Sequence, residues 1–173
     1  MGGDKTRRID EAEAAERGIF TGHSEMPNGE VRFRLRSRDG TAYIRTEAVT
    51  APISETEGWQ SSHLHKAVQE TYIVQTGRMA LVEIVEPGQV RTRIFSAGGI
   101  VTTQPGVAHN VFLFPGAVIH TVKHGEDGDL QDKHDTPALD EITRHLTIAE
   151  IIALDGTLRP LSNLSKPDQN PAE

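Results

Sequence analysis

Two histidines and one glutamate lie close together in the segment His-Leu-His-Lys-Ala-Val-Gln-Glu, residues 63–70. His63 and His65 are separated by a single residue, so on a β-strand their side chains point to the same face. Glu70 follows after a short turn, at the start of the next run of strand-forming residues. Two imidazoles and one carboxylate in this arrangement are suited to converge on a metal ion.

A third imidazole comes from further along the chain. The segment Pro105-Gly106-Val-Ala-His109 predicts a turn that opens another strand, which can bring His109 to the same place. Three histidines and one glutamate suit one divalent transition metal ion and leave coordination positions for water or substrate. We favour Fe(II), with Mn, Ni, Co, Cu and Zn as alternatives.

Two further side chains are candidate catalytic groups. Tyr72 follows Glu70 by two residues and should share its inward face, where a phenol can donate a hydrogen bond to a bound oxyanion. His120 shares one face of a later predicted strand with Val118 and Val122. We expect that face to point inward, which would make His120 a proton-transfer group, because imidazole titrates near neutral pH.

The elements that must position these residues are short strands. Runs of β-branched and aromatic residues alternate with Gly- and Pro-containing turns, which is typical of an all-β sandwich or barrel. After a strand at 31–38 and another at 41–50, the predicted strands cover residues 61–65, 71–76, 78–85, 90–95, 100–104, 109–114 and 117–124.

The first of these strands alternates apolar and cationic residues. The apolar set is Val31, Phe33 and Leu35, and we expect it to face the core. The other set is a row of arginines, which we interpret as a solvated face. These arginines are Arg32, Arg34, Arg36 and Arg38.

The remaining segments suggest how the chain is organised. We expect a flexible N-terminal arm at 1–20, a β-barrel at 21–125 and a polar loop with two short helices at 126–158. Thr136-Pro137 and the capping box Thr147-x-x-Glu150 mark the starts of these helices. A polar tail at 159–173 is predicted to be disordered.

The composition excludes several classes of protein. The net charge of −7 over 173 residues argues against partners that are nucleic acids or anionic membranes. Cysteine is absent, which excludes disulfides, thiolate–zinc sites and thiol nucleophiles. No apolar segment approaches the ~18 residues of a membrane span. We therefore expect a cytoplasmic protein that acts on a small molecule.

The sequence resembles the cupin superfamily over residues 30–124. Residues 58–77 match the first cupin motif, with one residue fewer before His63. Residues 98–113 match the second, although Gln104 and Leu113 stand where that motif has Pro and Asn. The resemblance implies a cupin-type β-sandwich barrel (a jelly roll) with one metal ion inside. The ligands that it implies are His63, His65, Glu70 and His109.

The resemblance leaves the reaction open, because one fold hosts many chemistries. The favoured hypothesis is a mononuclear metal oxygenase or related redox enzyme, whose apolar pocket would be built from Met79, Leu81, Ile94, Val111 and Leu113. The alternative is a metal-dependent isomerase, epimerase or lyase that acts on a sugar or another carbonyl compound. A third hypothesis is a non-catalytic cupin that binds a small ligand.

We also expect a homodimer. The strand that begins near Val31 has an apolar set of side chains, and edge strands of this kind need cover. The cupin resemblance likewise implies that two barrels pair, commonly through the N-terminal region.

Overall fold

The computed structural model describes residues 7–39, 41–125 and 132–164, and its strands form two six-stranded antiparallel sheets. The first sheet has the order β1 (Ile19–Glu25), β2 (Val31–Ser37), β3 (Ala42–Glu47), β10 (Val118–Gly125), β5 (Val68–Thr76) and β8 (Ile100–Thr103). The second has the order β11 (His134–Asp135), β4 (His63–Leu64), β9 (His109–Leu113), β6 (Arg78–Glu86), β7 (Gln89–Ser96) and β12 (Leu158–Pro160). The predicted all-β class is confirmed.

Between the sheets lies an apolar core. In β5 the buried residues alternate with partly exposed ones, as expected for a strand with a single inward face. The inward apolar residues of this strand pack against β6 and β9. This core contains Tyr72, Val74, Met79, Leu81, Val101, Val111, Leu113 and Ile119.

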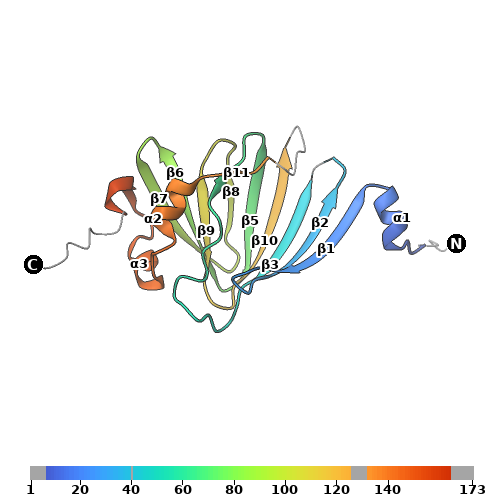
Figure 1. The fold of residues 1–173 in the computed structure, drawn as a ribbon, viewed down its shortest axis with the longest axis horizontal. Helices are drawn as coiled ribbons and strands as arrows, with labels where there is room; N and C mark the ends of the chain where they lie inside the picture. The colour runs from blue at the N-terminus through green and yellow to red at the C-terminus, as the bar shows by residue number, and fades with distance from the viewer. Residues whose placement is uncertain (1–6, 40, 126–131, 165–173) are drawn as a thin grey trace, which may run out of the picture.

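Two short helices cover the outside of the second sheet. They are α2 (Pro137–Thr143) and α3 (Ile148–Ala153), and the predicted capping box of Thr147 and Glu150 begins α3. Buried residues of both helices pack against the outer residues of β6 and β9. Trp59 fixes this packing, because its indole N–H donates to the carbonyl of Leu146 over 3.1 Å. Figure 1 shows both helices at the opposite end of the molecule from β1, β2 and β3.

The ends of the described chain also have regular structure. The predicted flexible arm contains α1 (Glu11–Glu16) and the start of β1. Where a disordered tail was predicted from residue 159, β12 pairs with β7, a 3-10 turn η1 (Leu161–Asn163) follows, and Leu164 is buried. The rest of that tail, 165–173, lies outside the described residues, as do 1–6 and part of the predicted polar loop, 126–131. No helix within the described ranges is both long and apolar enough to cross a bilayer.

The orientation of β2 is the reverse of our expectation. Arg32, Arg34 and Arg36 pair in register with Thr46, Ile44 and Ala42 of β3, and all six line the interior cavity of the barrel. The apolar set of Val31, Phe33 and Leu35 therefore lies on the outer face. Arg32 and Arg34 are half-buried, so interpreting them as a solvated face was wrong, whereas Arg36 lines the same cavity but is exposed.

Candidate metal centre

Three elements bring the expected ligands together. β4 carries His63 and is followed directly by His65, β5 carries Glu70, and β9 begins with His109. His63 and His109 are paired in register across β4 and β9. The turn before β9 is tied to His65, whose carbonyl accepts a 2.6 Å hydrogen bond from the N–H of Gly106. Gly106 has φ +81°, a conformation that favours glycine.

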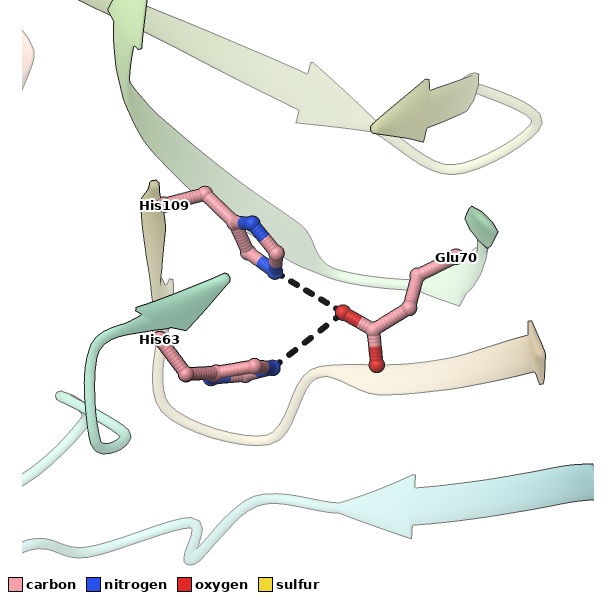
Figure 2. A group of neighbouring side chains, drawn as sticks. All are labelled: His63, Glu70 and His109. Atoms are coloured by element: carbon pink, nitrogen blue, oxygen red, sulfur yellow. Dashed lines mark hydrogen bonds and ion pairs between the residues drawn. The ribbon is translucent and has the colours of Figure 1, made fainter. Parts of the chain in front are cut away.

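The side chains of His63, Glu70 and His109 converge on one point (Figure 2). His109 Nε2 lies 2.8 Å from Glu70 Oε2, and His63 Nε2 lies 3.3 Å from the same oxygen. All three residues are buried, and the ligand atoms of this group lie within 4.8 Å of one another. A buried group of this composition could hold a metal ion.

His65 lies on the other side of the same carboxylate. Its Nε2 is 3.4 Å from Glu70 Oε1 and 3.2 Å from the ammonium of Lys123. Lys123 also forms an ion pair with Glu70 Oε1, because β10 places it opposite Glu70 in register. Lys123 was not among the residues predicted for the site, because only the pairing of β10 with β5 brings it to Glu70.

The second ring nitrogen of each histidine is bonded to a backbone carbonyl. His63 Nδ1 bonds the carbonyl of Ser61 over 2.9 Å, and His109 Nδ1 bonds that of Val107 over 2.9 Å. His65 Nδ1 bonds the carbonyl of Asp132. A carbonyl oxygen can only accept, so each Nδ1 carries a proton. In a neutral ring, the lone pair is then on Nε2, the nitrogen that faces Glu70.

This arrangement gathers hydrogen-bond acceptors around one point, which is unfavourable unless a cation lies among them. Burial lowers the pKa of His63, which favours its neutral ring. Burial alone would raise the pKa of Glu70, but its hydrogen-bond contacts with His109, His63 and His65 and the charge of Lys123 hold that pKa well below its ordinary value, so the carboxylate is ionised. The histidine contacts require a proton on Nε2, and in the neutral rings a bound metal cation would take the place of those protons. The donor set therefore fits a divalent transition metal ion.

Tyr72 lies beside these groups, as expected. Its hydroxyl donates to Glu70 Oε2 over 2.7 Å and lies 3.3 Å from His109 Nε2. Burial and the neighbouring Glu70 raise the pKa of Tyr72 well above its ordinary value. The phenol is therefore a proton donor at neutral pH.

His120 does not reach the centre. It pairs in register with Ile73, whereas the inward residues of β5 are Glu70 and Tyr72. On the outer face its ring bonds the hydroxyl of Tyr43 over 2.6 Å and the side chain of Gln75 over 2.8 Å. The expectation that His120 faces inward was wrong, because strand alternation shows which residues share a face but not which face is inside.

Asp132 is a supporting residue that the sequence analysis missed. Besides its carbonyl contact with His65, its carboxylate accepts hydrogen bonds from the backbone N–H groups of Lys66, Ala67 and Val68, at 3.1, 2.7 and 3.2 Å. These bonds fix the turn between His65 and Glu70. In the sequence Asp132 is one of several acidic residues in a polar segment, with no spacing to single it out.

A cavity of about 570 Å³ opens beside the centre. Its wall contains two of the expected ligands, His63 and Glu70, together with Tyr72. The expected apolar pocket was wrong: Met79, Leu81, Val111 and Leu113 pack in the core, and Ile94 packs against the cluster under the helices. The cationic side chains of the wall are Arg32, Arg34, Arg36, Lys123, Lys133 and Arg144.

Comparison with known proteins identifies the fold. No protein-family model matches the sequence, and no curated protein matches it. Among solved structures, a double-stranded β-helix protein of Klebsiella pneumoniae is similar over 76% of this chain and 98% of its own, with a TM-score of 0.50 and 15% identity. Oxalate decarboxylase of Bacillus subtilis is similar over 92% of this chain and 50% of its own, with a TM-score of 0.54 and 15% identity. The chain has the cupin fold.

Within this cupin barrel, the two segments that resemble the cupin motifs are the ones that meet at the centre. Residues 58–77 contribute His63, His65 and Glu70, and residues 98–113 contribute His109. The departures at Gln104 and Leu113 leave this geometry intact, since Leu113 packs in the core and Gln104 bonds Gln69 on the exposed side of the strands.

Proposed function

We propose that the protein is a metal-dependent enzyme that acts on a small polar organic substrate. The observation that carries this proposal is the orientation of the three histidines, whose Nδ1 atoms bond backbone carbonyls while their Nε2 atoms face Glu70. Hydrogen bonds of this kind fix the tautomer and the orientation of histidine ligands in metal sites. The proposed ligands are His63, His65, Glu70 and His109.

The reaction class that the site supports best is isomerisation, epimerisation or elimination at a carbonyl compound. A divalent metal ion bound there would polarise a carbonyl oxygen as a Lewis acid. Such reactions also need a group that moves a proton. The site offers two proton donors for the protonation step of such a reaction, the hydroxyl of Tyr72 and the ammonium of Lys123, both in contact with Glu70.

The chain's own residues have separate roles in this proposal. Tyr72 donates a proton or a hydrogen bond to a substrate oxygen, because its phenol stays protonated at neutral pH. Lys123 balances the charge of Glu70. The charged side chains of the cavity wall orient a hydrophilic substrate, which the apolar pocket of our first hypothesis would not do.

Oxygenase chemistry remains the second candidate. Three neutral imidazoles and one carboxylate suit Fe(II) with positions left for dioxygen and substrate. The cavity gives it less support, since its wall carries six cationic side chains and none of the apolar residues that this hypothesis expected.

Turnover with and without oxygen separates the two candidates. The metal-reconstituted protein is incubated with a panel of sugars, hydroxy acids and keto acids, under argon and under air. We expect turnover of at least one compound at equal rates in both atmospheres. Turnover that needs air and consumes oxygen would instead establish the second candidate, and no turnover in either would favour a binding protein.

A further inference from the structure

One wall of the cavity is a row of arginines from a single strand. Arg32, Arg34 and Arg36 alternate along β2, so their side chains share its inner face. They line the same cavity as His63 and Glu70. A substrate in this cavity therefore lies between the candidate metal centre and a cationic strand.

Most cations of the wall are already neutralised. Four of them have a carboxylate partner: Arg32 with Glu30, Lys123 with Glu70, Lys133 with Asp135, and Arg144 with Asp140. Within the described ranges, no carboxylate lies within ion-pair distance of Arg34 or Arg36. The uncompensated positive charge of the described wall is thus concentrated on these two side chains.

Arg34 is held in place without being neutralised. One of its guanidinium nitrogens donates to the hydroxyl of Ser24 on β1, and another lies 3.7 Å from the sulfur of Met26. Partial burial lowers the pKa of Arg34, and the neighbouring charges of Arg32 and Arg36 lower it further. The cluster is electrostatically unfavourable by itself, and a bound anion would relieve it.

We propose that Arg34 and Arg36 bind a carboxylate or phosphate group of the substrate, which is therefore a small organic anion. This rests on the proposed function, in which the other end of the substrate reaches the metal centre. Guanidinium groups match both anions, because their N–H donors can bond two oxygens at once. A cavity of about 570 Å³ is within the range of small-molecule sites.

Calorimetric titration of the full-length, metal-free protein tests this proposal with matched pairs of probes. Gluconate is compared with sorbitol, and glucose 6-phosphate with glucose, at constant ionic strength. We expect at least one anion to bind ~10-fold or more tightly than its neutral counterpart, since charge-assisted hydrogen bonds to a guanidinium are stronger than those to a neutral group. The pair that shows the difference identifies the anionic group as carboxylate or phosphate.

Variants then assign the binding to the arginines. Arg34→Gln should weaken binding of the preferred anion by ~10-fold or more. Arg36→Gln should weaken binding of the same anion by a similar factor. Because Arg36 is exposed, this second variant should fold normally even if Arg34→Gln does not. Arg45→Gln is the matched control, since Arg45 lies on the outer face of β3 and pairs with Glu47.

The proposal is overturned if neither anion binds more tightly than its neutral counterpart, or if Arg45→Gln weakens binding as much as the cavity variants. Metal content is measured separately by elemental analysis of the same preparations. Anion binding without any metal binding would contradict the proposed function but not the arginine site. Metal binding without any preference for the anions would contradict the arginine site but not the proposed function.

Discussion

The hydrogen bonds at Nδ1 determine what each histidine of the centre can do. With that nitrogen protonated and bonded to a backbone carbonyl, a neutral ring presents a lone pair at Nε2. Glu70 is acceptor-only when ionised, so the donor set needs a positive charge. Lys123 supplies part of it from one side, through Glu70 Oε1.

At this scale, Tyr72→Phe should separate catalysis from metal binding. The change removes the hydroxyl that contacts Glu70 and His109 but no proposed ligand atom. We expect metal content to be unchanged and turnover to fall by roughly 10²–10⁴-fold, the range for a lost proton-transfer group. Tyr43→Phe, on the outer face of the first sheet, is the control and should leave turnover unchanged. Equal activity of Tyr72→Phe and the unmodified protein would remove Tyr72 from the mechanism.

The sequence predicted that the three histidines would lie around Glu70 but not the other side chains near it. His63, His65 and Glu70 lie on two strands joined by a short turn, so local spacing constrains them. The contacts of Lys123 and Asp132 depend on pairing between distant segments, which local spacing does not reveal. His120 was misplaced because apolar neighbours were taken to mark the interior.

Among the elements, taking apolar residues to mark the interior also explains why the inner and outer faces of β2 were predicted the wrong way round. Its period of two predicted a strand correctly, but the inner face at this end of the barrel lines a cavity whose wall carries several charged side chains. Apolar residues therefore do not mark the inside there, and the arginines do. In β6 and β9 both faces are buried, so the prediction did not depend on deciding which face is the inner one.

The turn between β4 and β5 gives a prediction about pH. The backbone N–H groups of Lys66, Ala67 and Val68, together with His134, lower the pKa of Asp132 to about 2, against a burial effect that alone would raise it. A carboxyl group whose pKa is lower in the folded than in the unfolded protein stabilises the fold at every pH above its unfolded-state pKa, which is near 3.8 for Asp132. This stabilisation is lost as the pH falls from 3.8 toward 2. Asp132→Asn should therefore lower stability at pH 7 by about 1–3 kcal/mol.

Thermal unfolding of the unmodified protein and of Asp132→Asn, from pH 7 down to pH 3, measures this loss of stability. The difference in melting temperature should be constant above about pH 5 and should shrink as the pH approaches 3. Glu55→Gln, an exposed substitution in the loop before β4, is the control. A difference that does not change with pH would mean that the charge of Asp132 has no part in fixing the turn.

For the whole molecule, the most informative feature is the exposed apolar surface on the outer face of the first sheet. Side chains from β2 and β8 leave apolar surface there, with Val31 50% and Ile100 62% exposed. Across the same face runs an aromatic row formed by His23, Phe33, Tyr43 and His120. Exposed apolar surface on a sheet of this kind favours association.

We predict that the protein is a homodimer that pairs through this face. Light scattering at micromolar concentration should give twice the chain mass of 18.9 kDa. Val31→Asp should shift the population toward monomer, because it places a charge in the apolar contact. Ile53→Asp is the control, since Ile53 is 97% exposed in a loop outside the sheet. A monomeric unmodified protein would contradict the prediction.

Metal content tests the central claim most directly. Elemental analysis is performed on the full-length protein after purification and after reconstitution with Fe(II), Mn(II) or Zn(II) under argon. The account predicts about one equivalent of a transition metal per chain, its loss in the double variant His63→Ala, His65→Ala, and its retention in His120→Ala, whose ring lies on the outer face. Full metal content in the double variant, or none in the unmodified protein after reconstitution, would contradict the account.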